Sequence, residues 1–266
     1  MLSNVTFVSS IILTLIVVAC SIGGLLLLRR WMAATDLKPQ HDIADPYSQV
    51  VGMMFAVLLG FMVGDAMQRF STARSTVQQE AASLSDVFRL ADGMPDPEKD
   101  NVQRLCLKYA EQVVADEWPL LAHKKTSDSV WTIYRELWQA AVKYEPKSQA
   151  QSNVQQTLLP AMVSVSDNRR LRIEALNNGL PAVLWWVLVI GGLATVVFTY
   201  FFGASNVKIQ LIMVAIVSLV ICLNIFLLAS YDDPFSGDII VHPSAFETDI
   251  RLFSLELQAR VPKAGH

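Results

Sequence analysis

Four long stretches of the chain are almost free of charge, and they constrain the fold more than any other feature. They are residues 7–28, 46–68, 181–202 and 209–230, and Asp65 is the single charged residue within them. At about 1.5 Å per helical residue, each stretch is long enough to cross a hydrocarbon core of about 30 Å. We therefore expect an all-α integral membrane protein with four transmembrane helices.

The composition agrees with this class and argues against others. Hydrophobic residues make up 53% of the 266 residues and charged residues only 17%, which is a more apolar balance than that of a typical soluble domain. The net charge of -3 comes without any lysine or arginine block, so no nucleic-acid partner is expected. Cys20, Cys106 and Cys222 lie singly, and we expect them to be small buried residues.

The charge-poor stretches divide the chain into four regions. Residues 1–68 hold the first two spans, 69–179 a helical soluble domain, 180–230 the last two spans, and 231–266 an acidic turn and a C-terminal helix from Ser244 to about Arg260. The second helix is predicted to start at an Asp45-Pro46 cap and to run as one rod to about Ala91. Its outer part carries a stripe expected to be buried. That stripe consists of Val77, Ala81, Leu84, Phe88 and Ala91.

Three further helices are predicted inside the soluble domain. The first opens at Asp96-Pro97 and ends near Trp118, the second is capped by Ser127 or Asp128, and the third covers about residues 149–176. The second of them has an apolar face that consists of Val130, Ile133, Leu137 and Ala141. No useful length alternates with period two, so no strand is expected.

Motifs typical of enzymes do not occur in the chain. It has no glycine-rich phosphate loop, no GxSxG and no HExxH, and its histidines lie apart from one another. Asp116 and Glu117 are adjacent and point to different faces of a helix, so we expect solvated charges rather than an acid-base pair. The chain is therefore predicted not to be an enzyme and to need no redox or organic cofactor.

The second span carries a regular ridge. Met53, Val57 and Phe61 recur every four residues along one helix face, and Asp65 and Gln68 prolong that face. Ordinary packing between helices would explain this spacing. The sharper alternative is that several copies of the helix surround an axis, because apolar constrictions can gate ions by dewetting and charged rings can select them. The acid also favours a protein or water environment over lipid.

The sequence resembles the bestrophins, and more closely a bacterial bestrophin-like family. The residues that carry the first resemblance are Leu58-Leu59-Gly60-Phe61, Arg69-Phe70, Ala73-Arg74 and Asp233-Pro234-Phe235-Ser236-Gly237-Asp238. The residues that carry the second are His41-Asp42, Glu117-Trp118-Pro119, Asp167-Asn168-Arg169-Arg170 and Pro234-Phe235-Ser236-Gly237. Two spans, a helical insert, two spans and an acidic turn follow in the same order.

The resemblance implies a homopentameric ion channel, usually selective for anions, whose second helices line an apolar neck. Met53, Val57 and Phe61 match the neck positions. The family pattern has an arginine or a polar residue directly after the phenylalanine, where this chain has Met62-Val63. It also has a Ser-Tyr or Ala-Tyr pair before the arginine, where this chain has Ala66-Met67. Asp65 is a candidate for ion selectivity, since a ring of carboxylates would attract cations and oppose chloride. Its alternative role is an ion pair with Arg69 one turn later.

The acidic turn resembles the calcium clasp of calcium-regulated bestrophins. Asp232, Asp233 and Asp238 would supply the hard oxygen ligands that calcium takes, although capping of a turn by aspartate is a sufficient structural explanation. The expected function is a bestrophin-like oligomeric channel for passive transport of small monovalent ions; the alternative is a non-conducting scaffold or sensor of the same fold. By the same resemblance, it lies in a bacterial inner membrane with the middle domain and both termini in the cytoplasm.

Overall fold

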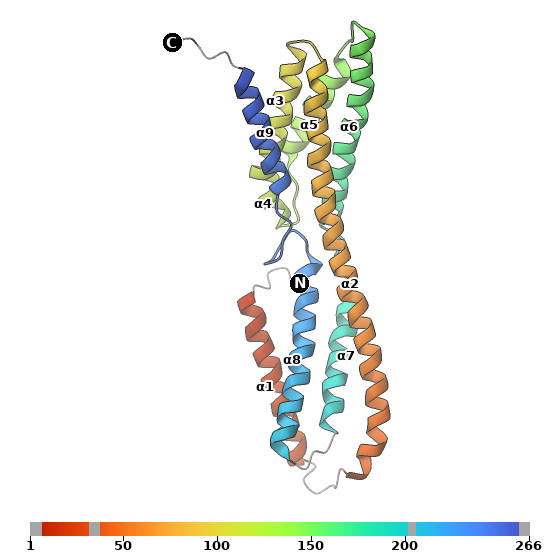
Figure 1. Ribbon diagram of the computed structural model, residues 1–266. Helices are drawn as coiled ribbons and strands as arrows, with labels where there is room; N and C mark the ends of the chain where they lie inside the picture. Colours follow the sequence, from red (N-terminus) through yellow and green to blue (C-terminus); the bar gives the residue numbers. More distant parts are fainter. Residues whose placement is uncertain (1–6, 32–37, 202–205, 261–266) are drawn as a thin grey trace. The chain divides into compact units, whose positions relative to one another are not determined.

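The computed structural model describes residues 7–31, 38–201 and 206–260, and over these ranges every regular element is helical (Figure 1). The chain divides into two compact units. The membrane unit comprises residues 1–70, 179–233 and 237–239, and the helical unit comprises residues 71–178, 234–236 and 240–266. The predictions of an all-α fold and of four spans are confirmed, with four candidate membrane helices among the described residues.

The membrane unit contains three whole helices and the first part of a fourth. These are α1 (Phe7–Trp31), α7 (Ala182–Tyr200), α8 (Val207–Asp232) and the beginning of α2 (Lys38–Leu90). The predicted start of α2 is wrong, because the helix begins at Lys38 and holds Pro46 in its interior. An interior proline removes one backbone hydrogen bond and crowds the carbonyl four residues before it, yet the turns on either side can still be helical.

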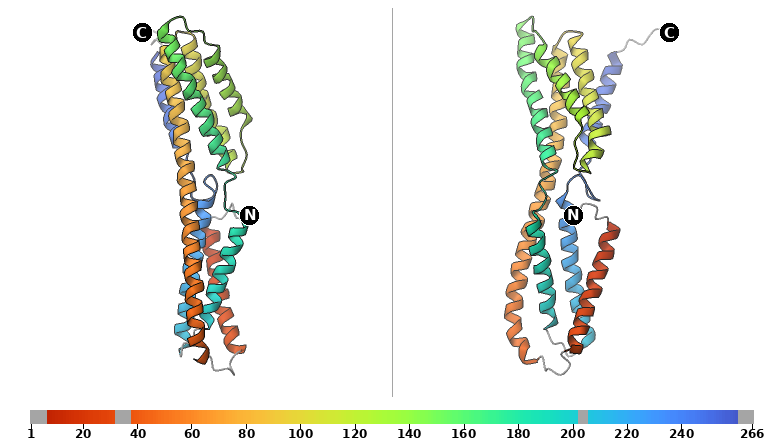
Figure 2. Two further views of the ribbon diagram at one scale, coloured as in Figure 1. Left: turned by 90° about the vertical axis from the view of Figure 1, so that its right-hand side faces the viewer. Right: turned by 180° about the vertical axis from the view of Figure 1, so that it is seen from behind.

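Helices α1 and α8 lie side by side (Figure 2) and contact each other near both ends of α1. At its beginning, the rings of Phe7 and Phe226 meet edge to face with their centroids 5.3 Å apart. Toward its end, the Arg29 guanidinium donates to the side chain of Gln210, near the start of α8. Since α1 meets the end of α8 first and its beginning last, the two helices are antiparallel.

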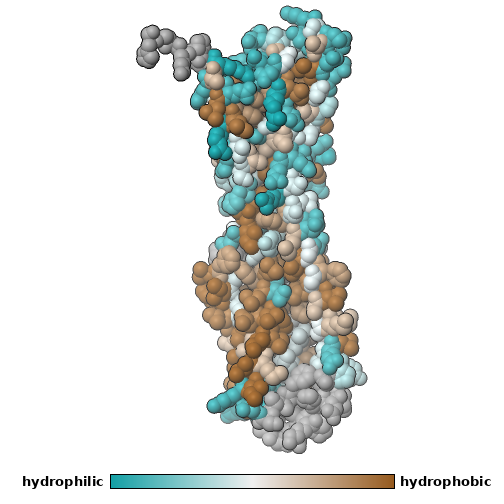
Figure 3. Space-filling view, viewed as in Figure 1, coloured by the Kyte–Doolittle hydropathy of each residue, from teal (hydrophilic) through white to brown (hydrophobic). Residues whose placement is uncertain are grey.

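The core of the membrane unit lies between α2, α7 and α8. Phe55, Leu59, Met62 and Ala66 of α2 are buried there with Leu188 and Leu228. Glycine at position 191 makes this close approach possible, because an added Cβ there would lie 2.7 Å from Phe55 Cδ2. Elsewhere the membrane unit turns apolar side chains outward, and Figure 3 shows them covering most of its visible face.

The remaining elements build the helical unit around the outer part of α2. They are η1 (Ala91–Gly93), α3 (Glu98–Gln112), the π-helical turn η2 (Val113–Glu117), α4 (Trp118–Leu121), α5 (Asp128–Lys143), α6 (Gln149–Glu174) and α9 (Ser244–Arg260). Both predicted apolar stripes are buried, the α2 stripe from Val77 to Ala91 and the α5 stripe from Val130 to Ala141. The predicted cap of α5 is Ser127, whose hydroxyl accepts from the backbone N–H of Val130 at 3.4 Å.

The C-terminal helix α9 closes the core of the helical unit. Phe253 stacks on Phe88 of α2 with ring centroids 4.1 Å apart, and Phe246 is fully buried. The expected burial of the cysteines is confirmed for Cys106 in α3 and wrong for Cys20, which is exposed in α1. Cys222 is half-buried. The difference arises because Cys20 and Cys222 lie on membrane helices whose surfaces are not fully covered by one another.

Candidate functional site: the outward face of α2 and a buried ion-pair cluster

The part of α2 that belongs to the membrane unit, up to Phe70, has two distinct faces. One packs into the membrane unit through Phe55 and Leu59, and the other carries the predicted neck residues Met53, Val57 and Phe61. Their exposed fractions are 72%, 50% and 75%. The ridge therefore does not fill the interior of its own subunit, and it is available to lipid, water or another copy of the chain.

Glycines accompany this outward face. A Cβ added at Gly52, Gly60 or Gly64 would meet no atom within 4 Å. These glycines are therefore not needed for close packing inside one subunit. In membranes, small residues on an outward face allow a neighbouring helix to approach closely.

Asp65 lies at the end of the ridge and forms the ion pair that was its alternative role. Its Oδ2 is 3.5 Å from Arg69 Nε, while 62% of its side chain remains exposed. Arg69 also contacts Asp232, with 3.3 Å between Nη2 and Oδ1. The same Asp232 oxygen accepts from the backbone N–H of Leu180 at 2.8 Å. Asp232 thus ties the end of α8 to α2 and to the segment that leads into α7.

Two of the three aspartates proposed for calcium, Asp232 and Asp238, are engaged by other groups of the chain. Asp232 is engaged by Arg69 and by Leu180, and Asp238 accepts from the backbone N–H of Phe7. Within the described ranges, no three acidic, histidine or cysteine side chains are grouped as ligands for a metal ion. A calcium site needs six to eight oxygens at about 2.3–2.6 Å. The role that the geometry gives Asp232 is structural.

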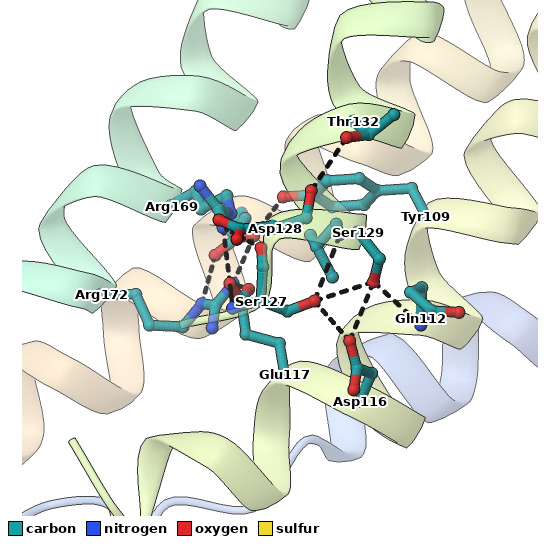
Figure 4. Close-up of polar contacts among 12 residues, drawn as sticks. Tyr109, Gln112, Asp116, Glu117, Ser127, Asp128, Ser129, Thr132, Arg169 and Arg172 are labelled. Atoms are coloured by element: carbon teal, nitrogen blue, oxygen red, sulfur yellow. Dashed lines mark hydrogen bonds and ion pairs between the residues drawn. The ribbon is translucent and has the colours of Figure 1, made fainter. Parts of the chain in front are cut away.

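The helical unit contains a buried cluster of two arginines and two glutamates, shown in Figure 4 around Arg172. Arg172 Nε is 2.7 Å from Glu80 Oε2, and its Nη2 is 2.7 Å from Glu117 Oε2. Arg169 Nη2 contacts the other oxygen of Glu117 at 2.5 Å. The hydroxyl of Tyr109 donates to Glu80 Oε1 at 2.7 Å. Four formal charges of balanced sign are therefore closed off from solvent together.

The electrostatics of this cluster keep Glu117 and Arg172 charged. Burial alone would raise the pKa of Glu117, but the charges and hydrogen bonds of Arg172 and Arg169 outweigh it and hold that pKa below its usual value. For Arg172, burial lowers the pKa and the neighbouring Glu80 and Glu117 more than compensate, so the pKa is raised. Burial and the charge of Glu80 raise the pKa of the Tyr109 phenol well above its usual value.

The expectation that Asp116 and Glu117 are solvated charges is wrong for Glu117, whereas Asp116 remains partly exposed. Glu117 is fully buried, and Asp116 accepts from the hydroxyls of Ser127 and Ser129. The π-helical turn that contains both residues directs Glu117 into the core. A signal was present in the sequence, since Glu80 falls on the same helix face as the apolar stripe beside Val77 and Ala81, where an acid requires a buried partner.

Motif residues of the family meet around this cluster. The Glu117-Trp118-Pro119 motif supplies Glu117, and the motif at 167–170 supplies Arg169. Trp118 lies between the guanidinium of Arg172, 5.5 Å from its ring centroid, and the ring of Phe235, with centroids 5.8 Å apart. Arg172, which belongs to no motif identified from the sequence, is the residue that joins Glu80 to Glu117. The arrangement clamps helices together and presents no nucleophile or paired acid and base.

Comparison with known proteins agrees with this architecture. The family model described as a bestrophin-like domain matches residues 15–246. No functionally curated protein matches the chain. Two crystal structures of a bacterial bestrophin homologue from Klebsiella pneumoniae, each with a single substitution, are similar at a TM-score of 0.64. They share 14% and 13% sequence identity, and the matches cover 92% and 94% of this chain and 99% of each homologue.

A third crystal structure, described as a membrane protein, has a TM-score of 0.59 at 12% identity and covers 95% of this chain and 98% of its own. At these identities the structures support the fold alone. The family model covers most of the chain and includes the neck ridge, the ion-pair cluster and the acidic turn. The chain therefore belongs to the bestrophin-like family.

Proposed function

We propose that several copies of the chain, most simply five, form a ring in which α2 lines a passive pathway for small monovalent ions. The observation that carries the proposal is the outward ridge of Met53, Val57 and Phe61, which is exposed although the opposite face of the same helix is packed. By likeness to the family the permeant ions are anions. The membrane is the plasma membrane of a bacterium, with the helical unit and both termini on the cytoplasmic side.

The ridge would act as an apolar constriction. Water leaves a narrow apolar neck easily, and an ion then faces a barrier because its hydration shell has no polar replacement. Asp65 and its neighbour Gln68, both exposed, prolong the ridge with polar groups. Such groups are costly to place against lipid, so they favour a ridge that faces water or protein.

The open glycines support assembly. Gly60 and Gly64 are four residues apart on α2 and have free space beside them, which suits close contact with another helix. Asp65 would affect ion selectivity if its carboxylate faced the pathway. A ring of these carboxylates would favour cations, against the family preference. Because Arg69 lies 3.5 Å away, the pair contributes little net charge to such a ring. No calcium-dependent step is included, since Asp232 is engaged by Arg69 and Leu180.

The experiment that tests the proposal uses the purified chain in liposomes. Chloride and sodium efflux are recorded on the same preparation whose oligomeric mass is measured in mild detergent. The proposal expects ion flux above that of protein-free vesicles, together with a ring-sized oligomer. A stable oligomer without flux of either ion would instead identify a non-conducting scaffold or sensor with the same fold. A monomeric, inactive protein would contradict the ring itself.

A further inference from the structure

The membrane unit contains a cavity of about 390 Å³ between α1, α7 and α8. Its walls are overwhelmingly apolar. Residues that form them include Leu13, Val17, Val189, Val196, Ile221 and Phe226. The cavity lies apart from the outward ridge of α2, since none of Met53, Val57 and Phe61 belongs to its wall. Neither the core of the unit nor the proposed pathway accounts for it.

The length of the cavity corresponds to one leaflet of a bilayer. Along α1 its wall runs from Ser10 to Ser21, and along α8 from Ser218 to Ala229, which is about 16 Å of helix axis in each case. Half of a hydrocarbon core is about 15 Å. A narrow apolar space of this length has the dimensions of one extended lipid chain.

Two hydroxyl groups of the wall donate hydrogen bonds to backbone carbonyls of the protein itself. The Tyr200 hydroxyl donates to the backbone carbonyl of Ser21 at 2.8 Å, and the Ser21 hydroxyl donates to that of Val17, also at 2.8 Å. The Ser218 hydroxyl is buried and has no hydrogen-bond partner within the described chain. The wall also includes Ser10 and Thr14, but polar groups form only a small part of it. A water, which needs two to four polar partners, therefore fits the cavity less well than an apolar occupant.

The cavity is open toward the surroundings of the membrane unit. Leu13, Val189 and Leu193 belong to its wall and also have more than half of their surface exposed. A neighbouring helix is too large to enter, since a helix about 10 Å across and 16 Å long takes up more than roughly 1,000 Å³. A flexible chain that enters sideways from the bilayer fits both the opening and the volume.

We propose that this cavity binds one acyl chain of a membrane phospholipid between α1, α7 and α8. Lipid outside the protein is as apolar as the cavity wall, so binding is driven by packing rather than by escape from water. An empty space of this size would deprive its lining of dispersion contacts. The bound chain thereby becomes part of the packing that holds α1 against α7 and α8. The proposal concerns the membrane unit alone and stands whether or not the protein conducts ions.

The test uses the full chain in phosphatidylcholine nanodiscs that contain a phosphatidylcholine with a diazirine in its acyl chain. After irradiation, labelled residues are mapped by mass spectrometry, and lipid retained through detergent washing is counted per chain by native mass spectrometry. We expect labels to concentrate on wall residues of the three helices, with one phospholipid retained per chain. Uniform labelling of all outward residues, or no retained lipid, would overturn the proposal.

Two neighbouring substitutions provide the matched control. Val17→Trp fills the cavity, whereas Ile16→Trp places the same ring on the outward side of α1, outside the wall. The first should lower retained lipid and wall labelling several-fold and the second should leave both unchanged. Val189→Trp and Ile190→Trp repeat the comparison on α7 if a variant of the first pair does not fold. Equal lipid retention in both members of a folded pair, or cross-links from the wall to a second copy in place of lipid, would contradict the proposal.

Discussion

Arg172 of α6 donates two hydrogen bonds to Glu80 of α2, at 2.7 and 3.1 Å, and both side chains are fully buried. The guanidinium thereby fixes α6 against the last third of α2, the longest helix among the described residues. A further contact, with Glu117, extends the hold to the π-helical turn. A buried pair of this kind contributes little over an apolar substitute, but the loss of one partner leaves an uncompensated charge in the core.

The first prediction concerns that uncompensated charge. Glu80→Gln keeps the shape of the side chain and leaves the cluster with an excess positive charge, which should cost about 3–5 kcal/mol of unfolding free energy. Thermal unfolding in detergent, followed by tryptophan fluorescence, would show a markedly lower midpoint. Asp100→Asn is the control, because its pair with Arg104 at 2.6 Å lies on the surface, where ion pairs contribute little to stability, and should leave the midpoint almost unchanged. Equal effects of the two substitutions would contradict the structural role of the cluster.

Asp249 of α9 predicts a dependence of stability on pH. Burial raises its pKa to about 6, although a hydrogen bond from Ser85 and the charge of Arg89 act in the opposite direction. Because the folded pKa lies above the unfolded value of about 3.9, the folded state binds the proton more tightly. The stabilising contribution is complete below pH 4 and is lost as the pH rises to about 6.

The variant Asp249→Asn should remove the loss of stability that accompanies the rise in pH. At pH 7.5 it should be more stable than the native chain, by up to roughly 3 kcal/mol because each pKa unit corresponds to 1.4 kcal/mol, and near pH 4 the difference should vanish. Unfolding midpoints at the two pH values are the measurement. Asp86→Asn, an acid-to-amide change at an exposed position of α2, should give equal small effects at both. A stabilisation by Asp249→Asn that is the same at both pH values would count against a raised pKa.

Phe61 provides the most direct test of the constriction. Phe61→Ala should raise ion flux in liposomes several-fold, since a smaller side chain widens the neck and allows water to remain in it. Leu27→Ala, at an outward position of α1 with a similar exposure, should leave the flux unchanged. If both substitutions have the same effect on flux, the ridge does not control permeation.

Asp65 allows the two roles of its carboxylate to be separated. Asp65→Asn should shift the reversal potential in asymmetric salt toward that of a more anion-selective pathway if the carboxylate faces the permeating ions. The measurement compares the native chain and the variant under the same gradient. An unchanged reversal potential would leave Asp65 with its structural role, the ion pair with Arg69 at 3.5 Å.

The glycines of α2 test assembly separately from conduction. Gly64→Leu should reduce the fraction of oligomer in mild detergent, because the added side chain occupies the space into which another helix would pack. Gly23→Leu introduces the same group at an equally open position of α1 and should leave the oligomer intact. The measurement is the oligomeric mass of both variants. If both lose the oligomer, or if neither does, α2 is not the contact between copies.

The fold was largely predictable because its strongest determinants are local and periodic. Charge-free lengths define the spans, and helical spacing defines the stripe from Val77 to Ala91, all of whose predicted members are buried. The start of α2 was not predictable from the Asp45-Pro46 signal, since a proline is tolerated within a helix when the neighbouring turns form. A proline-based boundary is a probability rather than a rule.

The polar core was harder to predict than the apolar one. Glu117 and Arg169 lie 52 residues apart in sequence, and only the folded chain brings them together. Their placement depends on a turn of π-helix, which no periodicity in the sequence announces. The ridge on α2 shows a different limit. The spacing of Met53, Val57 and Phe61 predicted that they share one face, but that face is exposed on a single chain, so the sequence does not tell what covers it.

The π-helical turn from Val113 to Glu117 carries a consequence for how this segment can vary. A π turn contains one residue more than the α turn it replaces. Deleting a residue within it would restore regular α geometry and rotate everything on one side by about 100° relative to the other. Either Tyr109 or Glu117 would then swing out of the core, so that Glu80 would lose a hydrogen bond or the two arginines would lose a carboxylate. Relatives that keep the four-charge cluster should therefore keep this segment at constant length, and alignment gaps should fall elsewhere.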